Sequence, residues 1–266
     1  MRFGWLSDIH LEFLDRDAID AFIVKLRRHD VDAWLVTGDI GVASSLTDHL
    51  RRFDASLAVP VCFTLGNHDH YGGSVVDVER EMRACVATAS RLVWLAGSEP
   101  TVMGGKVAIV GDDTWADARY GNARATPVLL NDFFRIADLK GLDRAALLKT
   151  LAHLADAAVA RLEARLRAAA GMCPEVVVLT HVPPFREAAW HEGRPSDDDW
   201  VPWFACRALG EAILRVAHGH PEVSFLVLCG HTHGEGEYRP AANVTVLTAA
   251  AEYGAPEVQR ILEIGS

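Results

Sequence analysis

The sequence predicts an α/β fold, and three observations lead to that class. Short, almost continuous apolar runs alternate with longer amphipathic stretches along the 266 residues. A strand covered on both faces of a sheet gives a continuous apolar run, whereas a helix that packs on the sheet has apolar positions spaced by three and four. Half of the residues are hydrophobic, which is enough for a large core and excludes global disorder. Regular alternation of strands with helices is typical of α/β proteins.

Six apolar runs are predicted to be strands, and five amphipathic stretches are predicted to be helices. The strands are residues 2–6, 33–37, 61–65, 107–110, 176–180 and 224–229, and the helices are residues 17–29, 46–53, 75–89, 143–170 and 205–217. In the longest helix Val159, Leu162 and Leu166 recur at helical spacing, and Gly171 is expected to end it. Three shorter runs follow at 235–239, 243–248 and 258–264, so part of the sheet system is expected to be antiparallel or mixed.

The charge balance limits the classes of partner. The chain has 36 acidic and 26 basic residues, which gives a net charge of −10. Because binding to duplex DNA or to anionic membranes depends on clustered basic residues, neither partner is expected. The longest apolar runs are also too short to span a bilayer. The chain contains no internal repeat, low-complexity tract or linker, and we expect residues 1–266 to form a single domain.

The five cysteines indicate a reducing compartment. They are odd in number and widely spaced, without a C-x-x-C pair, which is the pattern of neither a disulfide framework nor a zinc–thiolate site. The first residues lead directly into a strand-like run and lack the basic and apolar regions of a secretory signal. We therefore expect reduced thiols and a cytoplasmic protein.

Polar side chains that can bind metal ions follow five of the predicted strands. They are Asp8 and His10, Asp39, Asn67, His181, and His231 with His233. The carboxyl ends of strands are where ligands bind in open α/β sheets, so these side chains are expected to meet at one edge. No comparable set of Lys or Arg follows the same strands, and buried carboxylates require compensating charge. Metal ions would supply that charge.

The spacing and type of these residues favour two transition-metal ions. In D-x-H and H-x-H, residues i and i+2 point the same way when the backbone is extended. Imidazoles favour Zn, Fe, Mn, Co or Ni over Mg or Ca. Seven ligands are too many for one tetrahedral zinc ion but suit two ions with a shared carboxylate. Two ions about 3.5–4 Å apart can generate hydroxide and hold a phosphoryl group during in-line displacement.

Taken together, these segments resemble the calcineurin-like metallophosphoesterases, whose motifs are D-x-H, G-D, G-N-H-[DE], H and G-H-x-H. All five motifs occur here in order between residues 8 and 233. The resemblance implies a fold of two mixed β-sheets packed as a sandwich and flanked by helices. It also implies a metal-dependent phosphoesterase in which a metal-bridging hydroxide attacks the ester. The expected cofactors are two ions of Mn, Fe or Zn, with Ni or Co as further options.

The resemblance also implies a role for each motif residue. Asp8, His10 and His233 would hold the first ion, Asn67, His181 and His231 the second, and Asp39 would bridge the two. His68 would sit over the leaving-group oxygen as a hydrogen-bond donor or general acid, with Asp69 orienting it.

Departures from relatives narrow the expected substrate. Asp39 is followed by Ile40, Gly41 and Val42, where the protein Ser/Thr phosphatases of the superfamily continue with an Asp-Arg-Gly run. A phosphodiester or a small-molecule phosphomonoester is therefore expected rather than a phosphoprotein. Two alternatives remain open: a nuclease acting on single-stranded nucleic-acid ends, and a non-catalytic metal-binding scaffold of the same fold.

Two segments, 115–136 and 183–204, resist assignment to regular structure. The second contains Trp190, His191, Trp200 and Trp203, and we expect it to form either a substrate-facing rim or a self-anchored loop. Seven histidines lie outside the motifs, and as a group they are expected to be surface or capping residues: His29, His49, His70, His153, His191, His218 and His220. The exceptions to consider are His70, which adjoins the catalytic loop, and His191, which lies in the tryptophan-rich loop.

Overall fold

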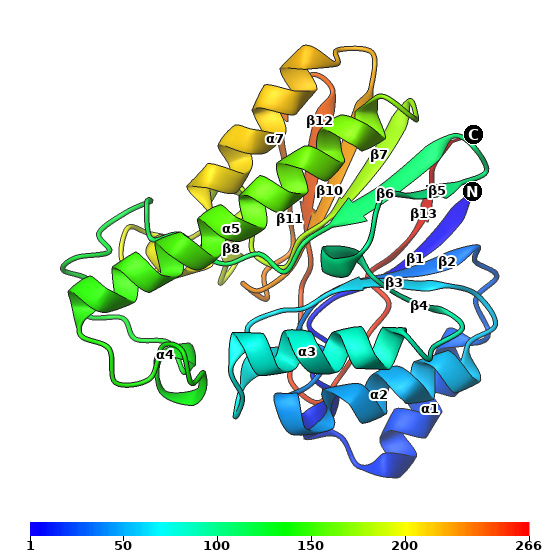
Figure 1. Cartoon of the computed structure of the whole chain (residues 1–266), viewed down its shortest axis with the longest axis horizontal. Coiled ribbons are helices and arrows are strands. Elements are labelled where there is room, and N and C mark those ends of the chain that lie inside the picture. Colours follow the sequence, from blue (N-terminus) through cyan, green and yellow to red (C-terminus); the bar gives the residue numbers. More distant parts are fainter. Residues whose placement is uncertain (266) are drawn as a thin grey trace.

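The apolar runs predicted as strands form the central strands of two β-sheets in the computed structural model, which describes residues 1–265 (Figure 1). The first sheet is mixed: its four parallel strands are joined at one edge by an antiparallel strand from the tail of the chain. Its spatial order is β13 (Arg260–Glu263), β1 (Arg2–Leu6), β2 (Ala33–Thr37), β3 (Val61–Thr64) and β4 (Leu92–Trp94).

The second sheet is also mixed, with a parallel centre and antiparallel edges. Its spatial order is β11 (Gly236–Ala241), β12 (Val244–Thr248), β10 (Ser224–Cys229), β7 (Glu175–Leu179), β6 (Val107–Gly111) and β5 (Thr101–Met103). The prediction that the tail adds antiparallel pairing is confirmed, because both β11 and β13 pair antiparallel to their neighbours. The short strands β4 and β5 were not predicted from the sequence.

Helices cover the outer faces of both sheets (Figure 1). The first sheet is covered by α1 (Arg16–Leu26), α2 (Ala43–Ser56) and α3 (Val75–Val86), and the second by α5 (Arg144–Ala170) and α7 (Arg207–Gly219). The side chain of Asp143 accepts a hydrogen bond from Ala146 N at 2.8 Å and so caps the start of α5. Gly171 follows its last residue, as predicted. Val159, Leu162 and Leu166 are buried against the second sheet.

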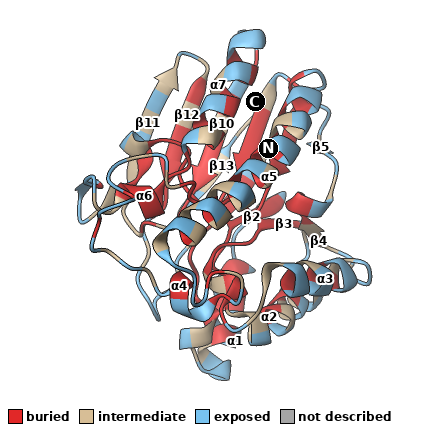
Figure 2. Ribbon diagram, turned by 60° about the vertical axis from the view of Figure 1, so that its left-hand side comes forward, coloured by how far each residue is buried: buried red, intermediate tan, exposed pale blue. Residues whose placement is uncertain are grey.

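Three apolar clusters pack between these layers, and this arrangement confirms the predicted sandwich. One lies between the two sheets and includes Phe3, Trp5, Ile109 and Leu228. The other two lie between each sheet and its helices, so that central strands such as β2 are fully buried, while the helices and edge strands such as β11 keep exposed residues (Figure 2). All five cysteines are buried and unpaired. Among residues 1–265, no helix combines the length and apolar character that crossing a membrane requires.

The two segments without predicted structure lie together. Residues 115–136 include the short helix α4 (Asp132–Arg135), and residues 183–204 include β8 (Trp190–His191), β9 (Arg194–Pro195) and α6 (Val201–Phe204). Asn122 N donates to Asp198 O at 2.7 Å, and the hydroxyl of Thr126 donates to Asp199 O at 2.9 Å. Each segment therefore supports the other.

Candidate metal centre

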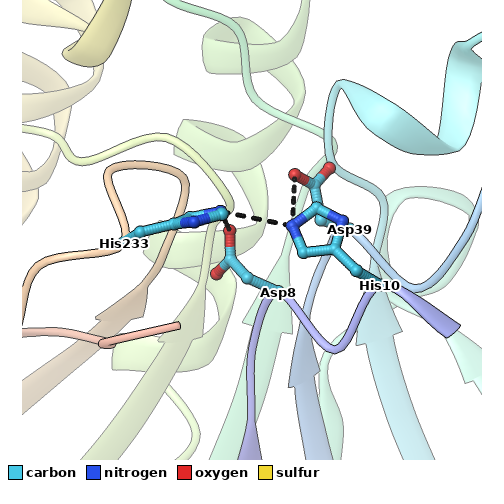
Figure 3. Close-up of side chains that lie close together, drawn as sticks. All are labelled: Asp8, His10, Asp39 and His233. Carbon is cyan, nitrogen blue, oxygen red and sulfur yellow. Dashed lines mark hydrogen bonds and ion pairs between the residues drawn. The ribbon is translucent and has the colours of Figure 1, made fainter. Parts of the chain in front are cut away.

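The loops that follow β1, β2, β3, β7 and β10 bring the seven predicted ligands to one place. Three of these strands belong to the first sheet and two to the second, and the contacts of Asn67 with His181 and His231 bring loops of both sheets together. Asp8, His10, Asp39 and His233 each offer an atom within 4.8 Å of the others, an arrangement that could hold a metal ion (Figure 3). Sequence order alone could not show that the first sheet and the second sheet meet at this edge.

The backbone is left-handed at most of these ligands. Asp8, His10, Asp39, His231 and His233 have φ between 42° and 71°, and they are five of the seven non-glycine residues with positive φ in the described chain. The prediction that the backbone is extended in the D-x-H and H-x-H segments is therefore wrong for both. Instead, the left-handed residues aim the side chains, and hydrogen bonds from Asp8 N to Gly38 O and from His10 N to Asp39 O join the loop after β1 to the loop after β2. Such unfavourable conformations concentrate at functional sites, where surrounding contacts enforce them.

The first cluster joins residues from β1, β2 and β10. The Nε2 atoms of His10 and His233 lie 3.2 Å apart, and Nε2 of His233 is 3.4 Å from Oδ1 of Asp8. Oδ2 of Asp39 lies 3.7 Å from Nε2 of His10 and 3.4 Å from Nε2 of His181. Asp39 thus stands between this cluster and the second one.

The second cluster is built around the side-chain amide of Asn67. Its Oδ1 lies 2.9 Å from Nε2 of His181 and 2.9 Å from Nδ1 of His231. The other nitrogen of each ring is held by the backbone, with His181 Nδ1 at 2.8 Å from Thr37 O and His231 Nε2 at 2.9 Å from Trp203 O. Ligand histidines in metalloproteins are typically oriented by such a bond from the second ring nitrogen.

The contact between His231 and Asn67 indicates that a cation fits here. The Trp203 carbonyl can only accept, so the His231 proton is on Nε2 and Nδ1 carries a lone pair. That lone pair faces Oδ1 of Asn67, which is also an acceptor. Two acceptors at 2.9 Å are unfavourable unless a positive charge lies beside them. Imidazole nitrogens together with amide and carboxylate oxygens suit a first-row transition-metal ion.

The charges of the buried side chains also favour bound cations at this site. Burial alone would raise the pKa of Asp8, yet a hydrogen bond from His233 and the charge on His181 lower it to about 2. Burial acts to raise the pKa of Asp39, but the hydrogen bond with His181 and the charges of His181, His68 and His10 together hold it well below its ordinary value. Burial acts to lower the pKa of His181, but the Asp39 carboxylate raises it to about 10. Two buried anions therefore draw positive charge into the cluster, which bound cations would supply.

Glycines and Asp69 hold the loops close together. A Cβ on Gly66 would overlap the Asp39 carboxylate, and one on Gly230 would overlap the Asp8 carboxylate. The buried Asp69 carboxylate accepts hydrogen bonds from the backbone N–H groups of Ile40, Gly41 and Gly66, at 2.8–2.9 Å. Asp69 thereby ties the loop after β2 to the loop after β3.

The His68 ring lies beside the carboxylate of Glu12, whereas the oxygens of Asp69 accept hydrogen bonds from backbone N–H groups. Its Nδ1 is buried and lies 3.6 Å from Oε1 of Glu12, while its ring stacks on Tyr71 with the centroids 4.2 Å apart. Oε1 of Glu12 is also 3.4 Å from Nδ1 of His10. With Nδ1 directed at Glu12, Nε2 is the nitrogen that can reach a ligand. The geometry favours Glu12 over Asp69 as the group that orients His68.

A cavity of about 240 Å³ opens beside both clusters. Its wall includes Asp39, His68 and the ligand histidines of the last motif, with Phe204 and Tyr253 as aromatic neighbours. No Lys or Arg is among the residues that line it. The ring of Tyr253 is half exposed and lies 4.6 Å from the ring of His10. A small molecule bound in this cavity could contact both clusters and His68 at once.

Two arrangements were expected for the tryptophan-rich segment, a substrate-facing rim or a self-anchored loop, and the positions of its tryptophans favour the loop. Trp203 is buried, and Trp200 packs against His191 and Phe204, which themselves line the cavity. Trp190 is half-buried, under Gly236. The tryptophans therefore anchor the loop, and His191 and Phe204 face the cavity.

Three residues of this site were not predicted from the sequence, and one histidine was misjudged. Glu12, Asp132 and Tyr253 have no strand-end motif: Asp132 begins the short helix α4 in a segment without predicted structure, and Tyr253 lies in a turn. His49, which was predicted to be a surface or capping residue, is buried, and so is His70, one of the two exceptions named from the sequence. Burial lowers the pKa of His70 to about 4, so this ring is neutral at physiological pH.

The fold and the clusters together define a class, the metal-dependent phosphoesterases with a two-ion centre between paired sheets. The sequence model of the family described as calcineurin-like phosphoesterase matches residues 1–235. The chain belongs to this family, and the predicted metal-dependent phosphoesterase activity is confirmed at that level. No curated protein sequence matches the chain.

Solved structures with the same fold extend over nearly the whole chain. A phosphopantetheinyl hydrolase from Mycobacterium tuberculosis has a TM-score of 0.73 at 16% identity, covering 99% of this chain and 96% of its own. A dimetal phosphatase from Danio rerio has a TM-score of 0.61 at 16% identity, covering 94% and 87%. GAP50, the anchor in the inner membrane complex of Plasmodium, has a TM-score of 0.52 at 14% identity, covering 97% and 76%. At these identities the likeness shows a shared fold.

Proposed function

We propose that this protein hydrolyses a phosphodiester or a small phosphomonoester with two bound transition-metal ions. Asp8, His10 and His233 are the proposed ligands of one ion, and Asn67, His181 and His231 those of the other, with Asp39 shared. The position of Asp39 between the clusters supports the shared role, since Oδ2 lies within 3.7 Å of a ring nitrogen in each. The imidazole-rich set favours Mn, Fe or Zn.

His68 is the proposed proton donor to the leaving group. When bound, the two ions would supply Lewis-acid charge for the phosphoryl oxygens and for activation of water. The burial of His68 acts to lower its pKa, but Asp39, Glu12 and Asp132 raise it above the ordinary value. The ring can therefore hold a proton at Nε2 near neutral pH. Its place in the cavity wall lets that proton reach an ester oxygen.

The observation that carries the substrate class is the cavity itself. It is small, and among its lining residues only histidines can carry a positive charge. A substrate with several phosphates, or a nucleic-acid strand, would place negative charge beyond the reach of the two ions without compensation. A single phosphate with a compact ester group matches this wall. The net charge of −10 supports the same choice.

The experiment is a turnover screen in which Mn, Fe, Zn, Co, Ni and Mg are each added to metal-free protein. The substrates are aryl and alkyl phosphodiesters, phosphomonoesters, cyclic nucleotides, single-stranded oligonucleotides and a phosphopantetheinyl ester, the last because of the structural neighbour's name. We expect metal-dependent turnover of a diester or a small monoester. Turnover of oligonucleotides alone would establish the nuclease alternative, and bound metal without any turnover would establish the scaffold. A cytoplasmic location remains a prediction.

A further inference from the structure

The carboxylate of Asp132 contacts Asn67. Asn67 is the one predicted metal ligand whose side chain ends in two different groups, an oxygen and an NH₂ group. Asp132 is the first residue of α4, in a segment to which the sequence assigned no role, and it is buried. Its Oδ1 accepts a hydrogen bond from Nδ2 of Asn67 at 2.8 Å and another from the hydroxyl of Tyr71 at 2.6 Å. Both bonds are short and well inside the range of strong hydrogen bonds to a charged acceptor.

The orientation of the Asn67 amide decides whether this residue can bind a cation. Its oxygen is a ligand atom, whereas its NH₂ group carries two hydrogens and cannot coordinate a cation. In the structure the oxygen faces His181 and His231, and the nitrogen faces Asp132. A metal ligand must be a neutral imidazole, and a neutral His181 has its proton on Nδ1, toward Thr37 O, and a lone pair on Nε2. The lone pairs on Nε2 of His181 and Nδ1 of His231 would then both attract the NH₂ group, so without a competing acceptor the amide would gain hydrogen bonds by rotating half a turn. That rotation would direct N–H groups into the second cluster.

We propose that Asp132 is a positioning residue that fixes the Asn67 amide with its oxygen toward the second cluster. A carboxylate can only accept, so it holds the NH₂ group firmly and cannot satisfy the rotated amide. The hydroxyl of Tyr71 fixes the same carboxylate oxygen in place. The inference rests on the proposed function, because it takes Asn67 to be a metal ligand.

Two substitutions of Asp132 separate the role of its acceptor oxygen in metal binding from the role of its charge. Asp132→Asn keeps an oxygen at the position of Oδ1 and removes the charge, whereas Asp132→Ala removes the acceptor. The readout is metal binding by the otherwise intact protein, measured by titrating Mn²⁺ or Zn²⁺ into metal-free samples and counting ions per chain. We expect Asp132→Ala to weaken the second ion by about 10–100-fold, as losses of outer contacts to metal ligands usually do. Asp132→Asn still offers an acceptor oxygen but can also donate to a rotated Asn67 amide, so it should lose less affinity than Asp132→Ala.

Tyr71→Phe is the matched control, because it removes the other hydrogen bond to Oδ1 and leaves the one from Asn67. It should bind the second ion more tightly than Asp132→Ala. Equal losses in Tyr71→Phe and Asp132→Ala would overturn the proposal, as would equal losses in Asp132→Asn and Asp132→Ala. Unchanged affinity in Asp132→Ala would also overturn it.

A measurement on the unmodified protein covers the case in which Asp132→Ala does not fold. In metal-free protein, the side-chain amide protons of Asn67 should exchange slowly with solvent in NMR spectra, because one of them is held in the buried bond to Asp132. Fast exchange, as for an exposed asparagine, would overturn the proposal. If every ester in the turnover screen fails while these results hold, the proposed activity is wrong and the positioning role of Asp132 stands.

Discussion

His68→Ala separates the proposed acid from the proposed metal ligands. The contacts within the two clusters do not involve the His68 ring. Its Nδ1 faces Glu12, its face lies on Tyr71, and it meets the proposed ligand His10 only edge to face, with the ring centroids 4.5 Å apart. Both ions should therefore remain bound. The loss of a general acid lowers kcat by about 10²–10⁴-fold. That range corresponds to roughly 2.7–5.4 kcal/mol of transition-state stabilisation, at about 1.36 kcal/mol for each factor of ten.

The size of the loss should depend on the leaving group. A nitrophenolate departs with little need of a proton, whereas an alkoxide requires one, so the variant should be impaired less on the aryl ester than on the alkyl ester. The assay compares kcat on both esters together with the number of ions bound per chain. His153→Ala, which removes an exposed histidine on α5, is the matched control and should behave like the unmodified protein. Loss of metal in His68→Ala would refute the assigned role, and equal losses on both esters would leave electrostatic stabilisation in place of proton transfer.

Three further substitutions test other parts of the account. Gly66→Ala should abolish binding of at least one ion, because the added methyl overlaps the Asp39 carboxylate; two ions bound with unchanged affinity in a metal titration would contradict this. Trp200→Ala should raise KM through displacement of His191 and Phe204 while leaving two ions bound, and loss of metal would instead indicate that the loop supports the centre. Burial and the nearby Asp112 raise the pKa of Asp113 well above its ordinary value, so the folded chain keeps a proton that the unfolded chain releases above about pH 4. The protonated Asp113 therefore stabilises the metal-free protein, and this contribution is lost as pH rises through the folded pKa. In Asp113→Asn, the free energy of unfolding from urea titrations should depend less steeply on pH. An unchanged slope would show that Asp113 is ionised in the folded chain.

The sequence predicted the layers of the fold and the residues that end its strands. The continuous apolar runs at β1, β2 and β10 coincide with the observed strands, because such runs are required only where both faces of a strand are covered. The short strands β4 and β5 were missed, since three residues are too few for a periodic pattern. Whether residues 1–266 form one domain remains a prediction.

The site was predicted less completely than the strands, for physical reasons. The motif residues could be found because they follow apolar runs directly. Glu12, Asp132 and Tyr253 act across long sequence separations through contacts such as the bond from Asn67 to Asp132, 65 residues apart. An acidic or aromatic residue in a loop has no pattern that distinguishes such a role from ordinary solvent exposure. The left-handed turns at Asp8 and His10 were equally invisible, because neither residue type requires positive φ.

The central claim is a two-ion centre in which Asp39 is shared, and the number of ions bound by Asp39→Asn tests it most directly. This substitution keeps the shape of the side chain and removes the charge that both clusters approach. We predict two ions per chain and metal-dependent ester hydrolysis for the unmodified protein. Asp39→Asn is predicted to bind one ion or none and to lose activity. An active Asp39→Asn protein that holds two ions tightly would contradict the account.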